Sequence, residues 1–449
     1  MRPMQSFEDR IREQEACIRR FDPRPPEEVL QERAMPKPLW ARRQFSDTGQ
    51  AQEPAVLKAA AESPANVFCI YTHVPYCRTR CGYCDCYSFP LTPSRKKELA
   101  VYPDLLEKEI SWWGRNVSEL FEKGLSTVHF GGGTPLMIGA DGLLRTVETI
   151  SKYFNLNKNT ELALESTSSD INEKILDSLK RVGFTRLHIG VQSLQDPIRK
   201  AIGRKESGKQ VLEKIRYAVG SGWIVSTDII IGLPGYTESD ILTDIEEMSA
   251  AGIEGLSIYE LVRSPRNRAF FEYHGILDPD ISAMWRQYQY AFWLAESHGY
   301  GLKIYNHMAK GRDDNRYFTS PSRGEDLLSF GTIADGWFGD YLYRHAELDA
   351  YRADVENDGP GLMGGMRRTA KEMKITRLEQ EIRSGRPDPL PFIEVLGPEK
   401  AMHLFQNWIA RGYLRVSADG DAAELLPNGS WFIMKMITDA VKLMDRYSS

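Results

Sequence analysis

Short apolar runs alternate with amphipathic stretches from Val67 to Tyr259, and this alternation constrains the fold more than any other feature of the sequence. Strands are expected at 67–72, 127–130, 162–165, 186–191, 225–231 and 256–259. Helices are expected between them at 103–123, 142–153, 171–182, 208–221 and 238–251. Alternating strands and helices indicate βαβ units around a parallel sheet. We therefore expect an α/β protein with an incomplete (β/α)6 barrel.

The chain on either side of this alternation has a different composition. Residues 1–65 are polar and contain several prolines, so we expect an N-terminal arm that is extended beyond a first helix over 6–21. Residues 66–368 should hold the barrel and its extension. Residues 369–449 contain helical runs at 371–382, 399–411 and 431–443 and a hairpin turning near Asp419–Gly420. This order predicts a small winged-helix-like C-terminal domain.

Composition excludes several classes of protein. The 449 residues carry 57 Lys+Arg and 62 Asp+Glu, a formal net charge of −5, which gives no electrostatic footprint for nucleic acid. No apolar run approaches the ~20 residues of a membrane span, and the N-terminus lacks an apolar signal core. We expect a cytoplasmic protein with neither a nucleic acid nor a membrane as partner.

Three cysteines follow the first expected strand in the spacing C-x3-C-x2-C: Cys77, Cys81 and Cys84. Three thiolates in one loop can hold three irons of a [4Fe–4S] cluster and leave the fourth iron open to an exchangeable ligand. Zinc is the main alternative, with Cys86 as the fourth ligand. Reduced cysteines without any ligand are the least favoured interpretation.

The cysteine loop, YTHVPYCRTRCGYCDC, resembles the cluster-binding motif of the radical SAM superfamily. The later motifs HFGGGTP, ALES, LHIGVQSLQD, DIIIGLPG and EDLLSFG resemble, in the same order, the oxygen-independent coproporphyrinogen III oxidase group. The resemblance implies a [4Fe–4S] cluster and S-adenosylmethionine (SAM), whose reductive cleavage gives a 5′-deoxyadenosyl radical. It also implies a low-potential electron donor such as flavodoxin or ferredoxin.

The resemblance assigns roles to individual residues. Cys77, Cys81 and Cys84 are the expected cluster ligands, whereas Cys86 matches a position that is not a ligand. The residues expected to surround the cluster and the first SAM are Tyr71, Gly131, Gly132, Gly133, Thr134, Glu165, Gln192, Arg204 and Asp228. A second SAM molecule is expected near Tyr259, Val262, Phe330 and Ile333.

Three residues are candidates for a proton donor or base: His307, Glu260 and Tyr259. A structural histidine with satisfied hydrogen bonds is at least as good an interpretation of His307.

The N-terminus departs from the oxidase group, because residues 1–66 lack its R-Y-T-S-Y-P-T segment. The nearest candidate for substrate contact is KPLWARRQFSD, with Trp40, Arg42 and Arg43. We therefore expect a two-SAM enzyme of the class C methyltransferase or cyclopropanase type, which transfers a methyl or methylene group to an sp2 carbon of a small planar natural product. The alternatives are oxidative decarboxylation of coproporphyrinogen III and anaerobic haem modification. A haem-binding chaperone is less favoured, because such relatives tend to lack the cysteine at the position of Cys86.

Overall fold

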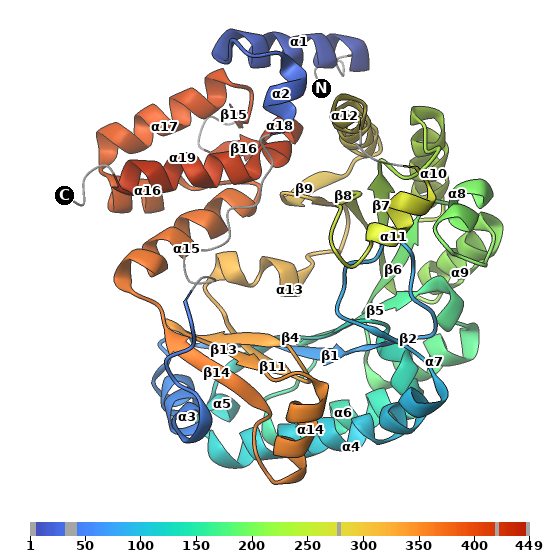
Figure 1. Ribbon diagram of the computed structural model, residues 1–449, viewed down its shortest axis with the longest axis vertical. Helices are drawn as coiled ribbons and strands as arrows, with labels where there is room; N and C mark the ends of the chain where they lie inside the picture. Colours follow the sequence, from blue (N-terminus) through green and yellow to red (C-terminus); the bar gives the residue numbers. More distant parts are fainter. Residues whose placement is uncertain (1–5, 32–42, 276–279, 418–421, 446–449) are drawn as a thin grey trace.

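The computed structural model describes residues 6–31, 43–275, 280–417 and 422–445. Its main element is a curved twelve-stranded sheet with the strand order β14-β13-β12-β11-β1-β4-β5-β6-β7-β8-β10-β9 (Figure 1). The six predicted parallel strands are confirmed. They are β1 (Val67–Val74), β4 (Gly124–Gly132), β5 (Glu161–Thr167), β6 (Arg186–Gln192), β7 (Ile224–Ile231) and β8 (Gly255–Glu260).

The sheet extends beyond these six strands on both sides. A seventh parallel strand, β11 (Asp326–Phe330), pairs with the outer side of β1. Beyond it lie three antiparallel strands, β12 (Asp335–Phe338), β13 (Tyr341–His345) and β14 (Leu362–Arg367). At the other edge, β10 (His307–Ala309) and β9 (Gly301–Ile304) continue the sheet in antiparallel pairing.

Helices cover the convex side of the parallel strands, as Figure 1 shows. They are α4 (Pro93–Asn116), α6 (Gly139–Tyr153), α7 (Glu173–Val182), α9 (Gly208–Gly220) and α10 (Glu238–Ala250). The first helix begins at Pro93 rather than at the predicted residue 103, because Thr92 caps it by accepting from Arg95 N at 3.3 Å. Pro103, which suggested a helix start, lies inside α4 and packs toward Gly142 of α6.

A short helix closes the barrel at the amino-terminal ends of its strands. In α13 (Arg316–Thr319), Arg316 Nη1 donates to the carbonyl oxygens of Ser126 at 3.3 Å and Asn159 at 2.6 Å. These carbonyls lie where β4 and β5 begin. The carboxyl-terminal ends, where the cysteine loop follows β1, are the end at which parallel barrels bind ligands.

The N-terminal arm is helical over more of its length than expected. The helix α1 (Phe7–Phe21) is confirmed, with Ser6 as its N-cap. The expectation of an extended arm beyond it is wrong for α2 (Pro26–Leu30) and α3 (Gln52–Glu62). Apolar contacts decide this: Val29 and Leu30 of α2, and Val56 and two alanines of α3, are buried. Trp40 and Arg42 lie outside the described residues.

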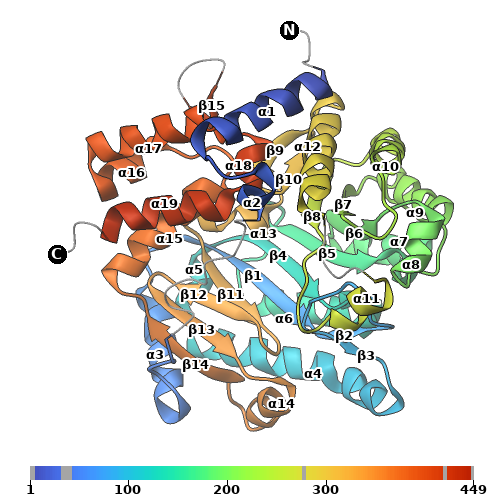
Figure 2. The same ribbon diagram turned by 45° about the horizontal axis from the view of Figure 1, so that its top comes forward.

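The C-terminal region follows the expected order of helices and hairpin. It comprises α15 (Ala370–Arg383), α16 (Pro389–Leu396), α17 (Pro398–Ala410), β15 (Leu414–Val416), β16 (Ala423–Leu425), α18 (Pro427–Trp431) and α19 (Ile433–Asp445). The strands β15 and β16 pair antiparallel, as the predicted hairpin requires, and its tip at Asp419–Gly420 lies outside the described residues. Figure 2 shows α1 lying between this region and α12 (Ile281–Ser297). None of the helices in the described residues is long and apolar enough to cross a lipid bilayer.

Candidate functional site

The cysteine loop leaves the carboxyl-terminal end of β1 and runs along the mouth of the barrel. Cys77 lies in β2 (Tyr76–Cys77), and Cys84 N donates to Cys81 O at 3.1 Å, which closes a turn. Cys77, Cys81 and Cys84 are half-buried, whereas Cys86 is exposed. The three half-buried thiols line a cavity of about 140 Å³ together with Gly133, Thr134 and Arg204. The structure thus brings the predicted cluster ligands together with three predicted cofactor residues.

The thiols of this loop differ in acidity. A hydrogen bond from Cys86 is the main reason why the pKa of the Cys84 thiol falls to about 6, while burial raises the pKa of Cys77. Within the described residues, no three His, Cys, Asp or Glu side chains surround one point as the ligands of a single metal ion do. Zinc sites usually combine two pairs of closely spaced ligands, whereas here three thiols in the spacing C-x3-C-x2-C lie in one loop. This donor set fits a [4Fe–4S] cluster.

Glu165 projects from β5 toward Gly131 of the neighbouring strand β4. Its Oε1 lies 2.9 Å from Nε2 of His129. Burial raises the pKa of the Glu165 carboxyl, but the hydrogen bond from His129 and the charges of His129 and His188 outweigh it and hold the pKa at about 2. Glu165 is therefore ionised at neutral pH and can accept hydrogen bonds from a ligand's amino or hydroxyl groups.

The glycine segment leaves room beside this carboxylate. A Cβ atom on Gly131 would lie 2.9 Å from the Tyr71 ring and 3.0 Å from Glu165 Oε2. Gly132 has φ +107°, a conformation that L side chains rarely adopt. A side chain at either position would displace the groups that face the barrel interior.

Asp228 lies in the middle of β7 and organises the end of β6. Its Oδ1 accepts hydrogen bonds from Val191 N at 2.8 Å and from Gln192 Nε2 at 3.0 Å. Burial raises the pKa of Asp228, but His188 and the Val191 N–H lower it below its usual value. Gln192 itself has φ +63°. A non-glycine residue in this region is strained, and such residues gather at functional sites.

Arg204 connects this side of the barrel to the cysteine loop. Its Nη2 donates to the hydroxyl of Tyr83, at 3.0 Å. Tyr83 stands between Cys81 and Cys84, and the sequence analysis did not identify it. Its position inside the C-x3-C-x2-C spacing is the signal that could have done so.

Several buried polar atoms around this site have no hydrogen-bond partner in the described part of the chain. They are His73 Nε2, Gln192 Oε1 and Arg204 Nε. Buried polar groups in proteins are almost always hydrogen-bonded. An amino acid or nucleoside bound here can supply the missing partners, so the residues fit SAM as well as the cluster.

The residues predicted for a second SAM do not form one cluster. Phe330 packs against Phe154 with ring centroids 6.2 Å apart, so its side chain lies in the core between sheet and helices rather than in the barrel. Val262 is exposed, just beyond β8. Tyr259 and Glu260 end β8, and burial raises the pKa of Tyr259. Ile333 has φ +54°, which is unusual for a β-branched residue.

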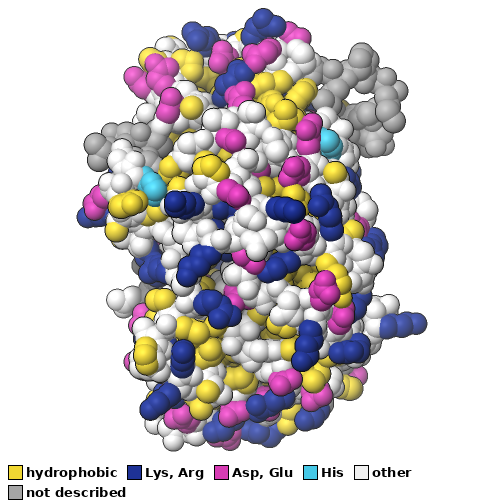
Figure 3. Space-filling model, turned by 90° about the vertical axis from the view of Figure 1, so that its right-hand side faces the viewer, with side chains coloured by type: hydrophobic (Ala, Val, Ile, Leu, Met, Phe, Trp, Pro, Cys, Tyr) yellow, Lys and Arg dark blue, Asp and Glu magenta, His cyan; other side chains and the backbone are white. Residues whose placement is uncertain are grey.

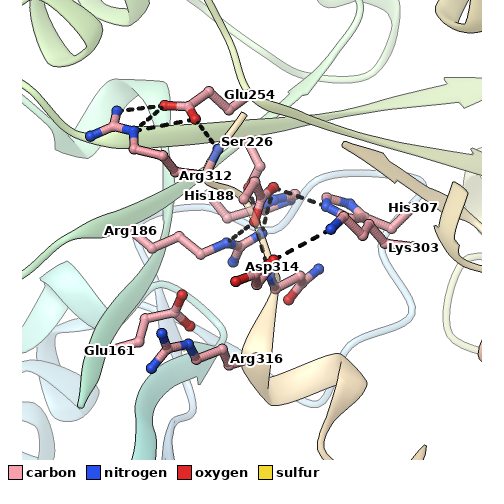
Figure 4. Close-up of polar contacts among 12 residues, drawn as sticks. Glu161, Arg186, His188, Ser226, Glu254, Lys303, His307, Arg312, Asp314 and Arg316 are labelled. Carbon is pink, nitrogen blue, oxygen red and sulfur yellow. Dashed lines mark hydrogen bonds and ion pairs between the residues drawn. The ribbon is translucent and has the colours of Figure 1, made fainter. Parts of the chain in front are cut away.

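His307 lies on β10 at the closed end of the barrel. Its Nδ1 is 2.8 Å from Ser257 Oγ, and its Nε2 is 2.9 Å from Asp313 Oδ2. Asp313 also accepts from Arg186 Nε at 2.7 Å. Figure 4 shows Arg186, Ser226 and His307 pointing toward one another from three strands.

Both ring nitrogens of His307 are therefore occupied, and burial lowers the pKa of its imidazole. A gap of about 20 Å³, the size of one water molecule, separates His307 from Glu165 and Tyr259. These contacts correspond to the structural interpretation of His307, and a catalytic role stays a prediction.

Comparison with known proteins places this geometry in a family. Residues 71–248 match the Radical SAM superfamily, and this segment contains the cysteine loop, the glycine segment, Glu165, Arg204 and Asp228. The sequence of this segment is therefore similar to that of radical SAM proteins. Proteins of this family use a [4Fe–4S] cluster and SAM, as expected from the sequence.

This chain is similar to curated proteins of two kinds. The chain is 27% identical to the oxygen-independent coproporphyrinogen III oxidase of Escherichia coli over 338 residues, covering 70% of this chain and 71% of the relative. It is 29% identical to the heme chaperone HemW of Mycobacterium tuberculosis over 216 residues, covering 47% and 54%. These relatives favour the alternatives of the sequence analysis over methyl transfer, for which they give no support.

The fold is that of a solved coproporphyrinogen III oxidase. The HemN structure from Escherichia coli superposes with a TM-score of 0.76 at 21% identity, covering 92% of this chain and 98% of that one. The likeness in fold extends beyond residues 71–248 to most of the chain.

Proposed function

We propose that this protein is a radical SAM enzyme that acts on a large planar substrate bearing carboxylates, of the coproporphyrinogen or haem class. The observation that carries the proposal is a cavity of about 980 Å³ between the sheet extension and α15. This volume lies at the upper end of the range of small-molecule sites. The names of the curated relatives, coproporphyrinogen III oxidase and heme chaperone, point to the same class of ligand.

The cavity lies on the same face of the sheet as the barrel interior. Strand register pairs Cys69 of β1 with Leu327 of β11, and Leu327 with Trp337 of β12. The row continues through Leu342 to Met366. Trp337, Leu342 and Met366 line the cavity. An apolar, partly aromatic floor therefore continues from β1, which leads into the cysteine loop, to the far edge of the sheet.

The rim of the cavity is positively charged. The arginines that line it are Arg43, Arg344, Arg368 and Arg383, against two lining carboxylates, Asp335 and Glu379. Arg344 pairs with Asp335 at 2.5 Å and Arg383 with Glu379 at 2.9 Å. Arg368 donates instead to the carbonyl oxygen of Gly339 at 2.5 Å. Arg43 is paired with Glu372 beside the cavity, so among these four arginines only Arg368 has no carboxylate partner in the contacts described. Arginines that line a cavity can bind a ligand's carboxylates in parallel hydrogen bonds.

Arg43 comes from the segment that the sequence analysis selected for substrate contact. Its Nη1 lies 2.5 Å from Glu372 Oε2 at the start of α15. Together with Phe45 it brings the N-terminal region over the cavity. This arrangement supports a role for that region in substrate binding, although the family's own N-terminal segment is missing.

When bound, the cluster and SAM supply a radical that removes a hydrogen atom from carbon. The chain's own residues provide orientation and exclude water. In the barrel, Glu165 and Asp228 provide fixed negative charges and Arg204 provides a fixed positive charge. In the cavity, the arginines position the carboxylates of the substrate.

Anaerobic turnover with coproporphyrinogen III, and separately with haem, tests this function. Methyl-deuterated SAM distinguishes the possible reactions. We expect unlabelled 5′-deoxyadenosine, no S-adenosylhomocysteine, and either loss of carbon dioxide from the porphyrinogen or a modified haem. Deuterated 5′-deoxyadenosine with S-adenosylhomocysteine would overturn the proposal in favour of methyl transfer. Tight haem binding without any SAM cleavage would overturn it in favour of a chaperone.

Binding to the cavity can be measured without turnover. Coproporphyrin III fluorescence titrations should give at least about tenfold weaker binding for Arg344→Gln combined with Arg383→Gln, since each lost charge-assisted hydrogen bond contributes about 1.5–3 kcal/mol. The matched control is Arg352→Gln in α14 (Leu348–Glu356), which removes only a pair with Glu356 at 3.3 Å, away from the cavity. Equal affinity of the double variant and the control would exclude the cavity as the binding site.

A further inference from the structure

The segment that follows β8 lies across the cysteine loop. We call it the strap and define it as residues 261–275, which include the short helix α11 (Arg268–Tyr273). Leu261 N donates to the carbonyl oxygen of Ile231 at 3.0 Å, so the strap begins at the carboxyl-terminal ends of β7 and β8. At its other end, His274 Nε2 lies 3.0 Å from the carbonyl oxygen of Ala201, the last residue of α8 (Asp196–Ala201). Figure 1 and Figure 2 both show α11 beside the chain that follows β2.

Asn267 joins the strap to the cysteine loop through a buried side chain, whose residue is only 1% exposed. Its Nδ2 donates to the carbonyl oxygen of Tyr83 at 2.9 Å and to that of Val262 at 2.8 Å. Its Oδ1 accepts from Ser264 N at 2.8 Å. One carboxamide therefore folds the strap and binds the cysteine loop at the same time.

The ring of Phe270 packs against the same turn of the loop. Phe270 is buried, and a Cβ atom on Gly82 would lie 2.5 Å from its Cδ2. The φ of Gly82 is not positive, so the ring rather than the backbone conformation excludes a side chain here. Ser264 Oγ adds a contact to the end of the loop by donating to Asp85 Oδ1 at 2.5 Å.

The outer surface of the strap is polar. Its buried residues are Leu261, Asn267, Phe270 and Phe271, and most of the others are exposed. Figure 3 shows the side of the molecule that carries α8 and α9, where basic, acidic and apolar side chains are mixed. A small number of inward contacts therefore holds the strap to the loop, and Asn267 supplies two of its donated hydrogen bonds.

Tyr83, whose carbonyl oxygen Asn267 binds, also faces the cofactor cavity. Its hydroxyl accepts from Arg204 Nη2 at 3.0 Å. Arg204 lines the cavity of about 140 Å³ with the three thiols, and its buried Nε has no hydrogen-bond partner in the described part of the chain. A movement of Tyr83 would therefore shift both the turn between Cys81 and Cys84 and the guanidinium group at the cavity.

We propose that Asn267 is a positioning residue for the cluster and for SAM. It holds the Tyr83 peptide, which sets the direction of the neighbouring Cys84. Through the Tyr83 ring it also fixes the Arg204 guanidinium, which is free to bind the carboxylate of SAM. Neither effect requires Asn267 to touch the cluster or SAM. The proposal rests on the radical SAM function above but not on the identity of the substrate.

The test removes the carboxamide in the full chain with its cluster reconstituted. Asn267→Ala should raise the dissociation constant for SAM, measured by calorimetry, at least about fivefold, because two donated hydrogen bonds are lost. The electron paramagnetic resonance spectrum of the reduced, SAM-bound cluster should differ from that of the wild type, because the loop around the cluster shifts. Iron and sulfide contents should stay at the wild-type level, because all three cysteines remain.

Asn428→Ala in α18 is the matched control, because Asn428 is also buried and its Oδ1 accepts from Trp285 Nε1 at 3.2 Å. It should lower the melting temperature yet leave SAM affinity within about twofold of the wild type, since distant sites act independently. Equal loss of SAM affinity in both variants would overturn the proposal, because general destabilisation would then explain it. Wild-type SAM affinity and an unchanged spectrum in Asn267→Ala would also overturn it.

A second pair of variants tests the strap without changing Asn267. Gly82→Ala should weaken SAM binding as well, because its methyl group collides with Phe270. Adding Phe270→Leu should restore part of the affinity, because the smaller side chain leaves room. Without this recovery the strap would not set the position of the loop, and the proposal would be wrong even if Asn267→Ala failed to fold. A wild type that binds the cluster and SAM but converts neither coproporphyrinogen III nor haem leaves these readouts intact, so the two proposals fail separately.

Discussion

The carboxylate of Glu109 lies 2.6 Å from the imidazole Nε2 of His345, and both side chains are closed to solvent. The other ring nitrogen, Nδ1, lies 2.9 Å from the carbonyl oxygen of Ala334. Since both nitrogens face acceptors, both donate, and the imidazole is positively charged. Burial lowers the pKa of His345, but the charge and hydrogen bond of Glu109 outweigh it and raise the pKa above its usual value.

This ion pair supports the segment beside the cluster loop. The second oxygen of Glu109 accepts from Tyr351 at 2.6 Å and from Gly331 N at 2.9 Å. Nearby, the hydroxyl of Tyr102 accepts from Thr332 N at 3.2 Å and donates to the carbonyl oxygen of His73 at 2.8 Å. The network thus joins the strained segment that ends at Ile333 to the strand that leads into the cysteines.

Glu109→Ala should lower the free energy of unfolding by about 3–5 kcal/mol, because it leaves a buried charge without its partner. Urea denaturation under anaerobic conditions measures the change. Glu107→Ala on the same helix is the control: it removes a more exposed pair with Arg145 at 2.6 Å, and such pairs contribute about 0–1 kcal/mol. Similar losses in the two variants would contradict a special role for the buried pair.

The contribution of His345 should depend on pH. Its pKa in the folded protein lies above the ordinary 6.5. The stabilisation is therefore complete below a pH of 6.5 and is lost as pH rises through the higher folded-state pKa. The difference in unfolding free energy between wild type and His345→Gln should be largest near a pH of about 6 and smaller near about 9. A difference that grows with pH would show that the imidazole is buried uncharged.

Alanine variants of Cys77, Cys81 and Cys84 should lose the cluster, whereas the alanine variant of Cys86 should keep it. Cys77→Ala, Cys81→Ala and Cys84→Ala each remove a ligand of the cluster, so each should lose most of the iron and sulfide bound after anaerobic reconstitution. Cys86→Ala should keep both, since its exposed thiol only donates a hydrogen bond to Cys84. If the purified wild type contained one zinc ion per chain and Cys86→Ala lost it, the assignment of the three cysteines to a [4Fe–4S] cluster would be wrong.

Two substitutions of Gln192 separate strain from binding. Gln192→Gly and Gln192→Ala both remove the amide that bonds Asp228. Both should therefore weaken SAM binding, measured by calorimetry, to a similar extent. The φ of +63° favours glycine, so Gln192→Gly should be more stable than Gln192→Ala by about 1 kcal/mol. If alanine were the more stable of the two, the backbone at this position would not be strained.

The barrel itself could be predicted because its signals are local. Apolar runs such as 67–72 are typical of strands in a sheet covered on both faces, and the helices between the strands have an apolar face at the helical period. The C-x3-C-x2-C spacing likewise places three thiols in one loop whatever surrounds them. The parallel pairing of β11 with β1 could not be predicted, because the two strands are about 250 residues apart in the sequence.

The sequence did not predict into which part of the molecule individual side chains point. A histidine at position 307 could act as a proton carrier or serve a structural role. The sequence does not show its hydrogen bonds to Ser257 and Asp313, which correspond to the structural role. Phe330 matched a site motif, but the alternation of the strand turns its ring toward Phe154.

Short-range patterns in the sequence are enough to predict the βαβ order, the cysteine loop and the residue types that line the barrel. The cavity between the sheet extension and α15 and the pairing of Glu109 with His345 arise only in the folded chain. Each of these joins residues that are far apart in the chain, and long-range contacts depend on how complete elements pack rather than on the pattern within any one of them.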